Sequence, residues 1–221
     1  MANSKIISFD LDGTLTDLKF VDSVWLEGIP RLYSISKTVS FNYAKEAVKQ
    51  EYDKIGKERL EWYNLGYWIR KFDLNITPQE LLGDFESRIA IFPEVPRVLS
   101  NLSEEGFELI VVTNARREFA ELELRKAEIE NHFKYVFSAT SDFGLLKNTV
   151  NLYKRVCSIL EIAPEEMIHV GDDLNFDFNV PRKLGILAFQ IDRTGKRKGE
   201  YVINNLEELK PNLAHSKENI N

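Results

Sequence analysis

The sequence has few of the features that mark secreted, membrane or nucleic-acid-binding proteins. Its 221 residues include a single cysteine, Cys157, so no disulfide can form within the chain, which favours a reducing compartment and predicts a cytoplasmic protein. No apolar run reaches the roughly 18 residues that a membrane-spanning helix needs. Basic residues form no cluster of the kind that binds nucleic acid, and the net charge is −6. We therefore expect neither a membrane nor a nucleic acid as a partner.

What the sequence does contain is a regular alternation of apolar runs and amphipathic stretches. With 43% hydrophobic residues, the chain can bury a substantial core. Short, nearly continuous apolar runs are typical of strands that are buried on both faces, and stretches with helical periodicity lie between them. This alternation predicts an α/β fold with a Rossmann-like parallel sheet and helices on both of its faces. The runs that predict strands are residues 5–10, 107–113, 134–139, 167–171 and 185–191.

Residues 17–89 differ from the rest because they contain no run that predicts a strand. Four successive helical patterns occupy this segment instead. Pro30 interrupts the first pattern, and we expect it to kink that helix. The apolar face of this first helix is predicted to consist of Val21, Val24, Trp25, Leu32 and Ile35.

The fourth pattern begins with a recognisable helix start. Thr77 is placed as the capping residue, Pro78 as the first helical residue, and Glu80 completes a capping box. Because the whole segment is helical and follows the first strand, we expect residues 17–89 to form an all-helical cap domain. The core domain would then consist of residues 1–16 and 90–221.

Polar residues gather after the first four predicted strands. The carboxyl ends of parallel strands meet at one edge of a sheet, and ligands bind there in open α/β folds. A single cluster of Asp, Asn and Gly is common in loops, where it forms turns and caps helices. The D-x-D-G-T string is much rarer, and its combination with three further clusters predicts a site. The clusters are Asp10 to Thr14, Thr113 with Asn114, Lys147, and Gly171 to Asp173 with Asp177.

The chemistry of this grouping points to a metal ion and a phosphate. Crowded carboxylates repel one another unless a cation neutralises them, and oxygen ligands suit Mg²⁺. Asp10 and Asp172 are the natural side-chain ligands, and Asp10 could also attack phosphorus to form an aspartyl-phosphate. Asp12 could protonate the leaving alcohol and then deprotonate the water that hydrolyses the intermediate. The phosphoryl oxygens would be held by Thr113, the backbone amide of Asn114, and Lys147.

These motifs resemble those of the haloacid dehalogenase (HAD) superfamily hydrolases, in the phosphatase branch that carries a helical cap after the first strand. The D-x-D-x-T motif of that family matches residues 10–14, and its G-D-x-x-x-x-D acidic loop matches residues 171–177. Its strand-closing threonine matches Thr113, and its lone lysine matches Lys147. The resemblance extends from residue 4 to about residue 206.

The resemblance implies a Mg²⁺-dependent phosphatase that acts on a small phosphate ester, and we expect a monomer or a homodimer. Asp10 would be the nucleophile and Asp12 the acid and base. The Mg²⁺ ligands would be Asp10, the backbone carbonyl of Asp12, and Asp172.

The same resemblance implies supporting roles for other residues. Asp173 or Asp177 would orient metal-bound water or Lys147. The sequence departs from the family at Asn148, because relatives often have proline after the lysine. The substrate-binding residues would be Leu11, Thr113 and Asn114.

Other functions on the same fold stay open from the sequence. Dehalogenases generally lack the second aspartate, because a halide leaves as an anion and needs no proton, so Asp12 favours phosphoryl transfer. A phosphomutase would differ in the lifetime of its phosphoenzyme, which no sequence feature decides. A non-catalytic binding domain would have no need for the acid at Asp12.

Aromatic residues of the helical segment allow two interpretations. At helical spacing they usually belong to a core, but one or two could line a pocket that closes over the substrate. The residues concerned are Trp62, Tyr63, Tyr67 and Trp68. His169 lies within the apolar run 167–171 and is interpreted as a core histidine.

Overall fold

A sheet of parallel strands forms the centre of the protein, whose computed structural model describes residues 6–209. The strand order is β3-β2-β1-β4-β5-β6, and all neighbouring strands are parallel. The order changes direction between β1 and β4, which is where ligands bind in such sheets. The strands are β1 (Ile6–Phe9), β2 (Glu108–Thr113), β3 (Tyr135–Ser138), β4 (Met167–Gly171), β5 (Leu187–Ile191) and β6 (Val202–Ile203).

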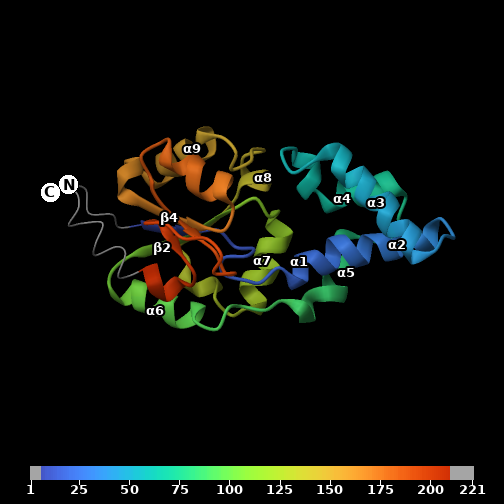
Figure 1. The fold of residues 1–221 in the computed structure, drawn as a ribbon, viewed down its shortest axis with the longest axis horizontal. Helices are drawn as coiled ribbons and strands as arrows, with labels where there is room; N and C mark the ends of the chain where they lie inside the picture. The colour runs from blue at the N-terminus through green and yellow to red at the C-terminus, as the bar shows by residue number, and fades with distance from the viewer. Residues whose placement is uncertain (1–5, 210–221) are drawn as a thin grey trace.

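Helices cover both faces of the sheet, because successive side chains of each strand point to opposite faces. Ile7 and Phe9 pack in an apolar cluster with α6 and α7, whereas Ile6 packs in another cluster with α9. Figure 1 shows α9 and α6 on opposite sides of the strands. The predicted α/β fold is therefore confirmed. The helices of this part are α6 (Val95–Glu104), α7 (Arg117–Lys126), α8 (Ala139–Asp142), α9 (Val150–Leu160) and α10 (Val180–Arg182).

All five strands that the sequence predicts are present, but the prediction missed β6. This strand has two residues, Val202 and Ile203, and it pairs only with β5 at the edge of the sheet. A run this short carries no periodicity, so no sequence pattern could separate it from a loop. Among the described residues, no helix is both long and apolar enough to cross a membrane.

Residues 19–88 form helices around a second apolar cluster, and no strand occurs among them. Trp68 and Leu65 are fully buried in this cluster, which also includes Phe119 of α7. In Figure 1 these helices lie at one end of the molecule, with α7 between them and the sheet. They are α1 (Lys19–Ser23), the π-helical turn Val24–Gly28, α2 (Ile29–Ser36), α3 (Phe41–Ile55), α4 (Leu65–Phe72) and α5 (Pro78–Phe85).

The irregularity expected at Pro30 takes the form of the π-helical turn that precedes it. Proline has no N–H to bond four residues back, and a wider turn absorbs the mismatch. The turn also shifts the phase of the helix beyond it, so the predicted apolar face fails at Ile35, which is 68% exposed. The predicted capping box is confirmed, because Thr77 Oγ1 accepts from the Glu80 N–H at 3.2 Å and Glu80 Oε2 accepts from the Thr77 N–H at 2.8 Å.

Close packing at Gly28 generates a stability prediction. A methyl group on Gly28 would lie 2.7 Å from Phe85 Cε2 and 2.9 Å from Leu81 Cδ1, both in the buried cluster. We expect Gly28→Ala to lower the free energy of unfolding by about 1–3 kcal/mol through overpacking. Gly83→Ala is the matched control, because the added methyl would meet no atom within 4 Å. The control should stabilise the protein by up to about 1 kcal/mol through helix propensity. Urea unfolding measures both changes, and equal shifts in the two variants would contradict the packing argument.

Candidate active site

The structure brings the predicted polar clusters together at the carboxyl edge of the sheet. Asp10 follows β1, Thr113 ends β2, and Asp172 follows β4. Lys147 reaches the same place from the loop between α8 and α9. Together these residues line a cavity of 290 Å³, whose wall also contains Asp12, Asn114, Asp173 and Asp177. The predicted convergence of distant segments is thus present.

An ion-paired lysine lies at the base of this cavity. Lys147 Nζ donates to Asp10 Oδ1 at 2.5 Å and to Asp177 Oδ1 at 2.6 Å, and the lysine is 2% exposed. Burial alone would lower the pKa of Lys147, but the charges of Asp10 and Asp177 outweigh it and raise the pKa above its usual range. Lys147 is therefore a permanent cation at neutral pH.

A second group of contacts fixes Asp177. Its Oδ1 also contacts His169 Nε2 at 3.0 Å, and its Oδ2 accepts from the Asp173 N–H at 3.0 Å. Burial opposes ionisation of Asp177, but the charge of Lys147 and the contacts with His169 lower its pKa to about 2. Both oxygens of Asp177 are thus engaged by protein groups.

His169 belongs to this network, although the sequence suggested only a core residue. Its ring is fully buried, and its Nδ1 lies 2.9 Å from Ser8 Oγ on the neighbouring strand. Its Nε2 lies 3.2 Å from the hydroxyl of Tyr153 as well as near Asp177. The polar residues Ser8 and His169 are paired in register between β1 and β4. A polar residue at matching positions of two apolar strands is the signal that could have suggested a buried polar network.

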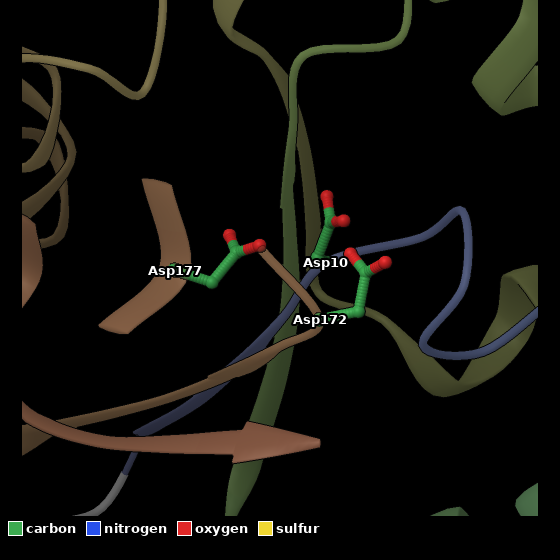
Figure 2. Close-up of side chains that lie close together, drawn as sticks. All are labelled: Asp10, Asp172 and Asp177. Atoms are coloured by element: carbon green, nitrogen blue, oxygen red, sulfur yellow. The ribbon is translucent and has the colours of Figure 1, made fainter. Parts of the chain in front are cut away.

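Three carboxylates of the site lie close enough to share a metal ion. Oxygen atoms of Asp10, Asp172 and Asp177 all lie within 4.8 Å of one another. Figure 2 shows the three side chains close together. Gly13 permits the approach of Asp172, because a methyl group on Gly13 would lie 2.6 Å from Asp172 Oδ2. Gly13 also has φ +76°, which favours glycine. An oxygen-only set of this kind fits a hard divalent cation.

The cavity contains more carboxyl groups than lysines. Burial, followed by the charge of Asp10, raises the pKa of Asp172 to about 8. The same two causes raise the pKa of Asp12 to about 7. Burial also raises the pKa of Asp10, although Lys147 opposes the shift. Ionised together, these carboxylates would face one lysine, so a bound cation would relieve their mutual repulsion.

Glu123 is a residue of the site that the sequence analysis missed. It is fully buried on α7, and its Oε2 accepts from Thr16 Oγ1 at 2.8 Å. Burial, followed by the charge of Asp12, holds the pKa of Glu123 well above its usual range. Its Oε1 and the Oδ1 of Asp12 are both buried without a hydrogen-bond partner. Nothing in the local sequence marks Glu123, because an acidic residue on an amphipathic helix is normally exposed.

Two predicted site residues occupy different surroundings from those expected. The side chain of Leu11 is fully buried in the core cluster beneath the sheet edge, so only its backbone can face a substrate. In the described range 6–209, Lys147 donates to Asp10 and Asp177 but not to Asp173. Asp173 accepts from the N–H groups of Asn175 and Phe176 and so caps the turn after β4. Between the two acidic residues proposed to orient Lys147, Asp177 is the one that contacts it.

The helical segment reaches the site through the loop that follows α3. Lys57 forms an ion pair with Asp173 at 2.9 Å, and Glu58 accepts from Asn148 Nδ2 at 2.7 Å. Asn148, which stands where relatives in the family often have proline, thus joins the core to the helical segment. Tyr63 accepts a long hydrogen bond of 3.4 Å from Asn114, whose Oδ1 accepts from the Lys147 N–H at 2.9 Å.

The aromatic residues of the segment divide between the two interpretations. Trp62 and Tyr63 line the cavity, whereas Trp68 is fully buried in the apolar cluster. Tyr67 packs against Trp68 with a ring-centroid distance of 5.1 Å and does not line the cavity.

The raised carboxyl pKa values generate a prediction about stability and pH. Each such carboxyl keeps a proton in the folded chain at pH values where the unfolded chain has lost it. Stability should therefore fall as pH rises from about 5 to 8, by up to about 1.4 kcal/mol, or 3–5 °C in Tm, per pH unit and group. The measurement is thermal unfolding in EDTA, with Asp172→Asn as the comparison.

The Tm of Asp172→Asn should depend less steeply on pH than that of the wild type, because the substitution removes the carboxyl group whose pKa is raised to about 8. Added Mg²⁺ should flatten the wild-type dependence in the same way. A wild-type Tm that is constant or rises over this range, or the same slope in Asp172→Asn, would contradict the account of the cavity charge.

Comparison with known proteins agrees with the geometry. Residues 4–185 match the haloacid dehalogenase-like hydrolase family. The GMP/IMP nucleotidase YrfG of Escherichia coli is 25% identical, with 75% of this chain and 73% of that protein covered. A glyceraldehyde 3-phosphate phosphatase of Pyrococcus furiosus is 25% identical, with 95% and 92% covered.

The fold also recurs in solved structures. A crystal structure of a HAD phosphatase from Thermococcus onnurineus superposes with a TM-score of 0.85, covering 95% of this chain and 97% of that one. Its sequence identity of 24% makes this a likeness of fold. Since the family match spans both the strand-end motifs and most of the chain, this protein belongs to the haloacid dehalogenase-like hydrolases.

Proposed function

We propose that this protein is a Mg²⁺-dependent phosphatase that hydrolyses a small phosphomonoester through an aspartyl-phosphate on Asp10. One observation carries the proposal: Lys147 is buried between Asp10 and Asp177, with Asp172 beside them in the same cavity. A fixed cation next to a carboxylate suits the transfer of a negatively charged phosphoryl group. The names of the relatives support this direction, because they include a nucleotidase and phosphatases of small phosphorylated metabolites.

Asp10 has the geometry of a nucleophile. Lys147 binds its Oδ1, and no residue in the described range 6–209 donates a hydrogen bond to its Oδ2. In the first step Asp10 Oδ2 forms a bond to phosphorus and the bond from phosphorus to the alcohol oxygen breaks. In the second step water attacks phosphorus, phosphate leaves, and the Asp10 carboxylate is restored.

Asp12 is the acid and base in this proposal. Its side chain lines the cavity two residues after the nucleophile, and its pKa of about 7 lies near neutral pH. It gives its proton to the departing alcohol oxygen and then accepts a proton from the attacking water. Glu123, which accepts from Thr16 Oγ1 at 2.8 Å, is the buried carboxyl group beside it.

The proposed Mg²⁺ ligands are the side chains of Asp10 and Asp172 with the backbone carbonyl of Asp12. Asp177 is assigned a supporting role, because its two oxygens already accept from Lys147 and the Asp173 N–H. When bound, the ion neutralises charge on the phosphoryl group. Asp173 supports the site indirectly, through the turn that it caps and through Lys57.

The phosphoryl oxygens are proposed to be held by groups that converge on Asp10. Thr113 is 1% exposed at the end of β2, and its Oγ1 accepts from the Ala115 N–H at 3.1 Å. Lys147 supplies the positive charge. The backbone N–H groups of Leu11 and Asn114 complete the set.

Residues 17–89 are proposed to act as a cap domain on a core of residues 1–16 and 90–221. The contacts of Lys57 and Glu58 with the core loops support this assignment. Such a cap would exclude bulk water from the phosphoenzyme. A cytoplasmic location and a monomeric or homodimeric state stay predictions.

The 2-haloacid dehalogenase and the phosphomutase are the alternatives on this scaffold. The presence of Asp12 favours a phosphatase over a dehalogenase, because a halide leaves without a proton and needs no general acid. A phosphomutase would use the same residues. It differs from a phosphatase in its product, because it transfers the phosphoryl group to another hydroxyl group and does not release phosphate to water.

The first test is release of phosphate from a panel of phosphomonoesters, with and without Mg²⁺. We expect Mg²⁺-dependent release by the wild type and a loss of at least about 10³-fold in Asp10→Asn, since the amide is not a nucleophile. Asp84→Asn is the matched control, because Asp84 is an exposed carboxylate on α5. Halide release from a 2-haloacid without metal, and no phosphate from any ester, would overturn the proposal.

The role of Asp12 has a separate test in the choice of leaving group. Asp12→Asn should slow esters of poorly acidic alcohols by about 10²–10⁴-fold, because their oxygen must be protonated as it leaves. 4-Nitrophenyl phosphate needs no such proton and should lose much less in the first step. Single-turnover rates separate this step from hydrolysis of the phosphoenzyme. Equal losses for both esters would remove Asp12 from the role of acid.

A further inference from the structure

Outside the proposed phosphate-binding groups, much of the cavity wall is apolar and aromatic. This part of the wall includes Trp25 and Trp62 from the helical segment and Phe119 from α7. The remaining apolar residues of the wall are Leu18, Val21, Tyr63, Ala115 and Phe176. The rest of the lining is polar and includes the residues assigned to the phosphate and the metal ion, so the apolar residues are the part of the lining left for the leaving group.

The aromatic wall is fixed by the residues behind it. Trp25 stacks on Phe119 with a ring-centroid distance of 5.7 Å and an interplanar angle of 6°. Tyr52, which is 6% exposed, packs edge-on against Trp25 at 6.1 Å and lies 5.8 Å from Trp62. Its hydroxyl donates to the Trp25 carbonyl at 3.2 Å, and Trp68 Nε1 donates to the Trp62 carbonyl at 3.2 Å. The wall is therefore preorganised, and a ligand would lose little free energy in ordering it.

Polar groups for a polyhydroxylated leaving group are scarce on this side. Two cations reach the cavity outside the catalytic set, Lys57 and Arg116. Lys57 is paired with Asp173 at 2.9 Å and Arg116 with Glu118 at 3.2 Å. The hydroxyl of Tyr63 donates to the Lys57 carbonyl at 3.1 Å. The hydroxyl groups of a sugar placed against this wall would therefore exchange water for few partners, whereas the face of a planar ring has no hydrogen bonds to lose.

We propose that the leaving alcohol of the substrate carries a planar aromatic ring, which packs against Trp25 and Trp62 while the phosphate lies on Asp10. The inference rests on the proposed phosphatase function and adds the substrate class. Flat rings stack favourably on tryptophan, and the apolar wall excludes water from both surfaces. The enzyme would distinguish one phosphomonoester from another by the ring, because the contacts with the phosphate group are common to all of them.

The test compares two esters of nearly the same alcohol. Adenosine 5′-monophosphate and ribose 5-phosphate both lose a primary 5′-alcohol, so the need for a proton is matched and the ring is the main difference. We expect kcat/KM at least about tenfold higher for the nucleotide. Trp25→Leu and Trp62→Leu should each bring the ratio of the two kcat/KM values toward one. Tyr33→Leu is the control that keeps the ratio, because Tyr33 packs on Phe72 and does not line the cavity.

Binding gives a readout that does not depend on turnover. Isothermal titration of Asp10→Asn with the same two compounds should show tighter binding of the nucleotide by at least about tenfold, with thermal unfolding as a check that each variant is folded. Equal kcat/KM and equal affinity for the two compounds, with phosphate release still dependent on Asp10, would overturn the ring inference and leave the phosphatase intact. If no ester is hydrolysed, the phosphatase proposal fails. The ratio of the two affinities then tests by itself whether the cavity prefers a compound with an aromatic ring.

Discussion

The structure depends on one buried cation, the ammonium group of Lys147. Taking an ammonium group out of water is costly unless carboxylates surround it closely, and here Asp10 and Asp177 do so at 2.5 and 2.6 Å. Asp177 has further contacts, because His169 Nε2 lies 3.0 Å from its Oδ1 and the Asp173 N–H donates to its Oδ2 at 3.0 Å. Even the backbone is adapted to this arrangement, since a methyl group on Gly171 would lie 2.3 Å from Asp177 Cγ. The sheet edge thus holds a charge pattern that suits a phosphate before any ligand arrives.

Much of this arrangement could be predicted from the sequence, because it follows from local signals. Apolar runs that alternate with amphipathic stretches indicate a parallel sheet, and parallel strands end at a common edge. Asp10, Thr113 and Asp172 each stand directly at such an end, so their meeting follows from topology alone. The start of α5 was equally predictable, because a capping box involves residues only three positions apart.

The rest depends on contacts that no local pattern records. Glu123 is buried because α7 turns it toward Asp12 and Thr16, and Thr16 lies 107 positions away in the chain. Lys57 meets Asp173 across 116 positions, from the segment between α3 and α4. Such pairs become visible only when the tertiary structure is known.

The π-helical turn Val24–Gly28 bears on how proteins of this architecture can diversify. Inserting or deleting one residue in a helix rotates everything beyond it by about 100°. Trp25 lies inside this turn, upstream of helices that are anchored by their own apolar cluster. A single-codon insertion or deletion here would exchange the side chain that lines the cavity at the position of Trp25 and leave the strand ends untouched. The selectivity for the leaving group that we propose for Trp25 would therefore change through this one stretch of helix, without a change in the residues of the chemical step.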